Sequence, residues 1–176
     1  MAPPISPRVR RGMLLRLTAS QAAPWGLEFP LNPESLHRTL ITSDIGRPQE
    51  TIAFRLQFDA TDALADRDPL STEVGIHPQV AVLERLLRPP TDDGVTLFAW
   101  GSRAVPVTVT ELAVNETMFD TALNPIRADV EVTLRVLPED PQGKMAVELV
   151  RANERWHERM ASQAPIPSRV AGTPES

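Results

Sequence analysis

The sequence predicts a mainly β fold, an antiparallel β-sandwich or β-barrel with one packed α-helix and a second α-helix near the C-terminus. Apolar and polar side chains alternate in residues 105–110 and again in residues 128–136. This period of two, rich in β-branched residues, is typical of half-buried strands. Asp120, Asn124 and Pro125 supply turn residues between the two runs. The stretch from Leu97 to Leu137 therefore predicts a long antiparallel hairpin with one apolar and one charged face.

The chain is expected to contain one folded domain with extensions at both ends. Residues 1–11 are rich in Pro and Arg and predict a disordered arm. Residues 12–137 form the predicted β domain, and residues 138–163 combine a linker with an amphipathic helix. Residues 164–176 again carry Pro, Ser and Gly and predict a disordered tail.

Composition limits the classes of partner and chemistry. The net charge of -5 gives no general electrostatic reason to bind nucleic acid. The chain has no Cys, which excludes disulfides, thiolate metal sites and cysteine nucleophiles. No secretory signal is recognisable, and no apolar run approaches the roughly 20 residues of a membrane span. We therefore expect a protein that folds in the cytoplasm, without a membrane span, a nucleic-acid partner, a metal or a cofactor.

Several shorter runs complete the predicted sheet. The candidate strands cover residues 12–18, 27–31, 35–42, 50–58 and 95–100. The Asp-rich segment 59–71 is expected to be a polar loop. The apolar phase of the outgoing hairpin arm shifts from odd to even positions, which predicts a β-bulge near Thr110 and Glu111.

Two segments carry helical periodicity. The first, Ile76–Arg88, places Val80, Leu83, Leu86 and Leu87 on one stripe and ends before Pro89. The second covers residues 144–162. Its apolar stripe comprises Met145, Leu149, Ala152, Trp156 and Met160. This stripe must cover something, either the sheet of its own chain or a neighbouring subunit.

The sequence offers little that predicts catalysis. His37, His77 and His157 fall in separate elements, and no two share the spacing of metal ligands. Trp25, Trp100 and Trp156 are more simply explained as core or interface anchors than as a stacking platform. A carboxylate pair distant in the chain, or His157, leaves a hydrolase as one alternative. A small-ligand or carbohydrate-binding β domain is another.

Four segments in order resemble the tube-type domain of contractile injection systems, the phage-tail-like particles whose baseplate member often carries a LysM domain. The segments are Phe29–Ser35 (FPLNPES), Phe54–Asp62 (FRLQFDATD), Leu97–Ser102 (LFAWGS) and Met118–Val130 (MFDTALNPIRADV). Together the resemblance covers roughly residues 27–137. No LysM-like segment follows the hairpin, which sets this chain apart from the LysM-bearing members.

The resemblance implies a structural, non-enzymatic role. Members of the family form sixfold rings between the spike hub and the inner tube, where they start tube growth or adapt one ring to the next. The implied partners are further copies in a hexamer, the inner tube protein and the spike or hub protein. The implied location is a particle assembled in the cytoplasm and then released or attached to a membrane or cell wall. A cap or terminator of the same tube is an alternative position.

Residues within the resembling segments, and one Trp of the C-terminal helix, become candidate interface or structural residues. They are Asn32, Pro33, Phe58, Asp59, Trp100, Gly101, Phe119, Asp120, Pro125, Arg127 and Trp156. Arg127, next to the turn, is expected to make a structural ion pair or loop hydrogen bonds. The polar hairpin face, with Asp129, Glu131, Thr133 and Arg135, would line a wet lumen in such a ring.

Overall fold

The structure is a computed structural model that describes residues 10–19, 23–42, 48–88, 94–137 and 144–164. The chain is mainly β, with the strands in one antiparallel sheet. The strands are β1 (Met13–Leu17), β2 (Trp25–Glu28), β3 (His37–Thr42), β4 (Pro48–Asp59), β5 (Val95–Trp100), β6 (Arg103–Phe119) and β7 (Pro125–Val136). The helices are α1 (Thr61–Ala65), α2 (Pro69–Val74), α3 (His77–Leu87) and α4 (Lys144–Ser162).

The seven strands follow the order β2-β1-β5-β6-β7-β4-β3 and do not close. β2 and β3 are the two edge strands of this single sheet, so neither the sandwich nor the barrel expected from the sequence is confirmed. The predicted arm up to residue 9, the linker at 138–143 and the tail from residue 165 lie outside the described residues.

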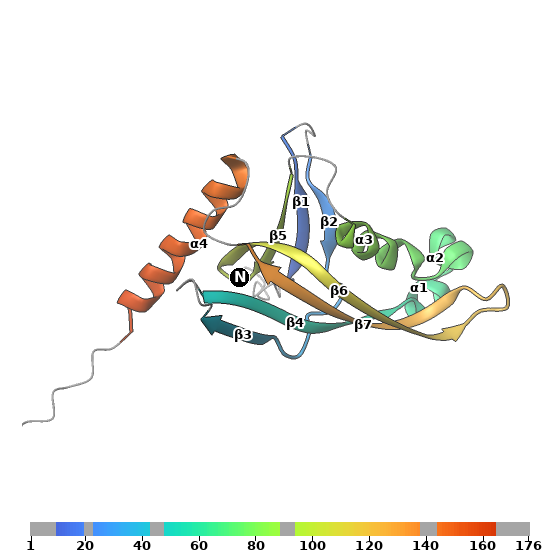
Figure 1. Cartoon of the computed structure of the whole chain (residues 1–176). Coiled ribbons are helices and arrows are strands. Elements are labelled where there is room, and N and C mark those ends of the chain that lie inside the picture. The colour runs from blue at the N-terminus through green and yellow to red at the C-terminus, as the bar shows by residue number, and fades with distance from the viewer. Residues whose placement is uncertain (1–9, 20–22, 43–47, 89–93, 138–143, 165–176) are drawn as a thin grey trace, which may run out of the picture.

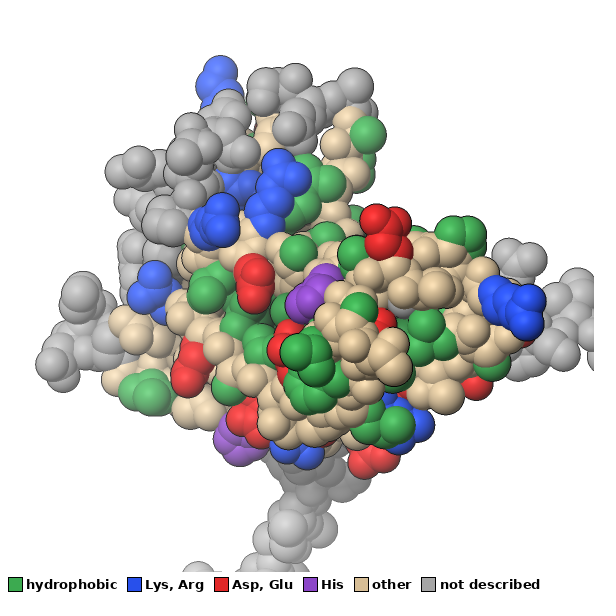
Figure 2. All heavy atoms as spheres, turned by 90° about the vertical axis from the view of Figure 1, so that its right-hand side faces the viewer, with side chains coloured by type: hydrophobic (Ala, Val, Ile, Leu, Met, Phe, Trp, Pro, Cys, Tyr) green, Lys and Arg blue, Asp and Glu red, His purple; other side chains and the backbone are tan. Residues whose placement is uncertain are grey.

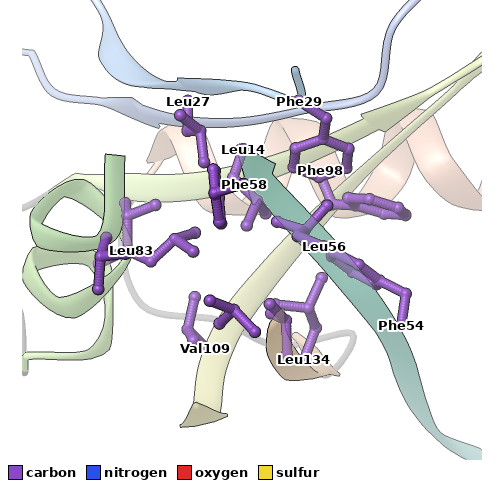
Figure 3. Packing of buried hydrophobic residues seen from close by; sticks show 14 of the residues in the cluster. Leu14, Leu27, Phe29, Phe54, Leu56, Phe58, Leu83, Phe98, Val109 and Leu134 are labelled. Atoms are coloured by element: carbon purple, nitrogen blue, oxygen red, sulfur yellow. The ribbon is translucent and has the colours of Figure 1, made fainter. Parts of the chain in front are cut away.

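A strong bend brings distant strands of the sheet together over one core. β1, β2 and β5 stand across the ribbon formed by β3, β4, β6 and β7 (Figure 1). Phe54 of β4 stacks on Phe98 of β5 with ring centroids 5.4 Å apart, although β6 and β7 separate these strands in the sheet. Phe29 packs on both rings (Figure 3). The two parts of the bent sheet therefore bury each other's concave face and together form most of the core.

The long hairpin of β6 and β7 follows the predicted alternation. Ala128, Val130, Val132 and Leu134 are buried, while the residues between them lie on the opposite, polar face. The register between β6 and β7 shifts between Val109 and Glu111, which confirms the predicted bulge. The bulge moves the apolar side chains of β6 from odd to even positions and keeps both halves of the strand on the same face.

Other boundaries differ from the prediction. β2 ends at Glu28, because Pro30 cannot continue the ladder, although Phe29 is fully buried. The predicted polar loop at 59–71 contains α1 and the start of α2. Both helices are short and without a strong apolar stripe, so periodicity could not reveal them. Leu87, expected on the buried stripe of α3, is exposed.

The helices cover opposite parts of the sheet. α3 contacts β2 and β6, and α4 contacts β6 at the other end of the molecule (Figure 1). The face that α4 buries consists of Ala146, Val150 and Asn153. The predicted stripe from Met145 to Met160 lies beside this face and is only partly covered by its own chain. Its docking on a neighbouring subunit, the other alternative, stays a prediction. Among the described residues, none of the helices has both the length and the hydropathy needed to cross a bilayer.

Candidate assembly surface

The predicted interface residues fall into two groups at opposite ends of the hairpin. Around its turn, Phe58, Asp59, Pro125 and Arg127 lie close together because β4 and β7 pair in that register. Arg127 forms the expected ion pair: its Nε lies 2.6 Å from Oδ2 of Asp59, its direct cross-strand partner. Phe58 is buried in the core and Pro125 is buried at the start of β7, so neither offers a free surface.

Asp120 organises the turn itself. Its Oδ1 accepts hydrogen bonds from the backbone N–H groups of Ala122 and Asn124, each at 2.8 Å, and its Oδ2 accepts one from Nδ2 of Asn124 at 2.9 Å. These hydrogen bonds lower the pKa of Asp120, those from Asn124 most of all. Asp120 therefore remains an anion that holds the turn in one conformation.

The turn is also tied to the helical segment beside it. Asn124 donates from Nδ2 to the backbone carbonyl of Glu73 at 3.0 Å, and Ile76 donates its N–H to the carbonyl of Pro125 at 3.1 Å. Gly75 makes this approach possible, because a Cβ there would lie 2.2 Å from that carbonyl oxygen and its φ is +59°. The far end of the hairpin is thus fixed against the start of α3.

Exposed apolar side chains surround this fixed turn. Met118, Phe119 and Leu123 are 52%, 51% and 78% exposed. Phe119 is one of the predicted interface residues, and Met118 and Leu123 are not. Figure 2 views this end of the molecule and shows hydrophobic side chains on it among acidic, basic and histidine side chains. We call Met118, Phe119 and Leu123 the hairpin tip.

The second predicted group lies where β5 turns into β6. Trp100 stacks on Phe98 with ring centroids 6.2 Å apart, and Gly101 forms the turn with a φ of +61°. Trp156 of α4 donates from Nε1 to Oγ of Ser102 at 3.3 Å. These contacts make Trp156 an anchor of α4 on its own chain.

Asn32 joins this second group through Gly12. Its Oδ1 accepts the N–H of Gly12 at 2.9 Å, and its Nδ2 donates to the carbonyl of Arg10 at 2.8 Å. A Cβ on Gly12 would meet the Trp100 ring, so Gly12 lies directly against that ring. Asn32 and Pro33 also border a shallow hollow of about 360 Å³. Asn32 thereby holds the start of β1 beside the β5–β6 turn.

A charged cluster that the sequence prediction missed lies beside this second group. Arg103 donates from Nη1 and Nη2 to the two carboxylate oxygens of Glu50 at 3.1 and 2.8 Å, and Arg38 donates from Nε at 2.6 Å. Arg103 also contacts Nε2 of His157 at 3.1 Å, and its guanidinium lies 5.6 Å from the Trp156 ring. The cluster connects β3, β4 and β6 with α4.

The sequence did contain a signal for this cluster. Glu50 continues the buried phase of Ile52 and Phe54, and Arg103 continues that of Val105 and Val107. A charged residue in the apolar phase of a strand indicates a buried partner.

The electrostatics of the cluster suit a structural role. Burial raises the pKa of Glu50, but the hydrogen bonds from Arg103 and Arg38 outweigh it and leave that pKa below its ordinary value. Burial and then the positive charge of Arg103 lower the pKa of His157, which Glu50 only partly opposes. At neutral pH the carboxylate is ionised and the imidazole is neutral, an arrangement that stabilises contacts.

The predicted stripe of α4 borders an apolar groove instead of filling the core. Met145, Leu149 and Ala152 face Leu17 and Pro24 across a hollow of about 500 Å³. Glu148 and Arg155 lie at its rim. We call this hollow the α4 groove.

Comparison with known proteins adds no family to this description. No protein-family model matches the chain, and a search of curated proteins gives no significant match.

Proposed function

We propose that this chain is a ring-forming structural subunit of a contractile injection particle, acting at the baseplate between spike hub and inner tube. The observation that carries the proposal is the hairpin of β6 and β7, apolar toward the core and polar on its other face, within a sheet whose edges stay open. The ordered resemblance of four segments to tube-type domains supports the same role.

Open edges give a physical reason for assembly. Every residue of β3 is exposed, and its outer side is not paired to another strand of the described sheet. An unpaired edge is a template for strand addition, and ring closure removes such edges. One heterologous contact, repeated until the rotation closes, is sufficient to build a ring. In this proposal several copies jointly form a closed, barrel-like wall, which the open sheet of one copy cannot form alone.

The polar face of the hairpin would then line the channel. Asp129, Glu131, Thr133 and Arg135 of β7 share this face with exposed residues of β4 and β6. A face with both signs of charge and no large apolar patch is compatible with water and with passing cargo. The core face of the same strands is already occupied by Phe54, Phe98 and their neighbours.

The experiment is to measure the mass of the full chain in solution and to image it by negative stain, alone and mixed with the inner tube and spike-hub proteins. We expect sixfold rings, alone or on addition of a partner. The variant Ile41→Lys, on the exposed edge of β3, should reduce ring formation, whereas Ala113→Lys, exposed on the polar face, should not. A chain that stays monomeric and binds neither protein would disprove the proposal.

A further inference from the structure

The hairpin tip holds apolar residues in a backbone conformation that they disfavour. Met118 and Leu123 have φ angles of +54° and +66°, in the left-handed region where Gly and Asn are favoured and larger side chains are strained. Both side chains are largely exposed, so the subunit gains little packing from them. The backbone conformation of Leu123 closes the turn, where its N–H donates to the carbonyl of Asp120 at 3.0 Å. The two side chains gain no comparable packing and stay available for a contact with another molecule.

The tip is also preorganised. The hydrogen bonds of Asp120 within the turn, and those of Asn124 and Pro125 to the segment before α3, fix it at both flanks. A rigid apolar projection loses little conformational entropy on binding, which favours insertion into a matching hollow.

The α4 groove provides such a hollow on the same molecule. Its apolar wall consists of Leu17, Pro24, Met145, Leu149 and Ala152. Its volume of about 500 Å³ exceeds the ~150 Å³ of a cavity that accommodates a benzene ring. It therefore has room for more than one of the tip side chains.

Charges at the two sites are complementary. Glu73, Glu116 and Asp120 lie around the tip, where Arg127 is already paired with Asp59. One side of α4 beside the groove carries, at helical spacing, Lys144, Glu148, Arg151 and Arg155. The tip is acidic and this flank of the groove is basic on balance, so two tips would repel each other while tip and groove attract.

From this geometry we infer that the hairpin tip of one copy inserts into the α4 groove of a second copy. The two sites lie at opposite ends of the molecule (Figure 1), so the contact is head-to-tail and repeats from copy to copy. The inference rests on the proposed function and names a contact through which copies of that assembly would join.

Disulfide trapping tests the contact directly, because the chain has no Cys and each introduced thiol is the only one. Full-length Leu123→Cys and Ala152→Cys proteins are mixed under mild oxidation, and we expect mixed disulfide dimers. Leu123→Cys mixed with Ala113→Cys, exposed on the polar face, should give none. Two outcomes would overturn the inference while leaving ring formation intact. In the first, rings form under the oxidising conditions but no disulfide between the Leu123→Cys and Ala152→Cys proteins is trapped. In the second, Leu123→Cys forms disulfide dimers with itself in preference to mixed ones.

A second variant separates association from folding. Leu123→Gly removes the apolar side chain and suits the positive φ, so the melting temperature should stay the same or rise. Self-association, followed by mass measurement against concentration, should weaken by about tenfold or more, as expected for loss of one buried Leu. Leu87→Ser, at an exposed Leu of α3, is the control that should leave association unchanged. Unchanged association of Leu123→Gly would contradict the inference.

Discussion

Arg103 binds both carboxylate oxygens of Glu50 even though β7 lies between their strands in the sheet. Their side chains are only 10% and 9% exposed. The pair closes the end of the bent sheet, and through Arg103 it also contacts Trp156 and His157 of α4. An ion pair between two strands of the sheet therefore also supports the C-terminal helix, beside the packing of its buried face.

Removing one member of this pair should strongly destabilise the protein. Glu50→Ala leaves Arg103 buried without its carboxylate, and we expect the free energy of unfolding to fall by about 3 kcal/mol or more. The control is Glu131→Ala, which breaks the exposed Arg55–Glu131 pair and should cost at most ~1 kcal/mol. Urea titrations followed by circular dichroism measure both. Equal losses would show that the buried Glu50 pair contributes no more to the free energy of unfolding than the exposed pair does.

The attachment of α4 should weaken in mild acid. The pKa of His157 in the folded chain is below its ordinary value of 6.5. The unfolded chain therefore takes up a proton first as the pH falls, so the stability contributed by neutral His157 is present above that value and declines below it. Protonated His157 would also face the positive charges of Arg103 and Arg38, which the carboxylate of Glu50 opposes only in part.

Fluorescence of Trp156, recorded between pH 8 and pH 5 in a Trp25→Phe, Trp100→Phe background, follows this change. His157→Gln should flatten the response in that range. A response that persists unaltered in His157→Gln would assign it to another group.

Two glycines with nearly the same φ should differ in their tolerance of a side chain. Gly101 has a φ of +61° and open space around it, so Gly101→Ala should cost only the conformational strain, about 1 kcal/mol. Gly75→Ala adds a clash with the Pro125 carbonyl, 2.2 Å from the new Cβ. We expect a clearly larger loss of thermal stability and faster amide exchange at Ile76. Similar melting temperatures for the two variants would contradict the tie between the turn and α3.

Asp59 should matter more than its partner Arg127. Asp59 accepts the backbone N–H of Thr61 at 2.8 Å as well as the Arg127 side chain. Burial raises the pKa of Asp59, but the bonds from Thr61 and the charge of Arg127 lower it overall. Arg127→Ala should cost at most ~1 kcal/mol, since the pair is nearly half exposed. Asp59→Ala should cost more, as measured by urea unfolding, because the start of α1 also loses its acceptor. Equal costs would show that the Thr61 contact contributes nothing.

Local patterns predicted the strands well and the way they come together poorly. The alternation in β4 and β7 and the phase shift at Glu111 are properties of neighbouring residues, and the structure follows them. Whether the sheet closes depends on its curvature and on register between strands far apart in the chain. The pairing of Glu50 with Arg103 likewise links residues whose contact exists only after the sheet bends.

The covered face of α4 shows a second limit of periodicity. Two apolar stripes run side by side along this helix, one through Met145 and Leu149 and the other through Ala146 and Val150. The larger side chains of the first stripe led to the prediction that it would be covered. In the structure the smaller side chains of the second stripe are buried, because they allow α4 to pack closely against β6. Of the three hairpin-tip residues, the sequence predicted Phe119 as an interface residue. The exposed position of Leu123 becomes apparent only once the turn is built.

The fully exposed strand β3, with Leu40 and Ile41 uncovered, has a consequence for the solitary subunit. In the proposed ring a neighbouring copy would cover this edge. A subunit outside the ring would present an unpaired strand that can template aggregation. The purified chain should therefore form fibres or turn turbid as its concentration rises. A binding partner that covers the edge of β3 should keep the solution clear.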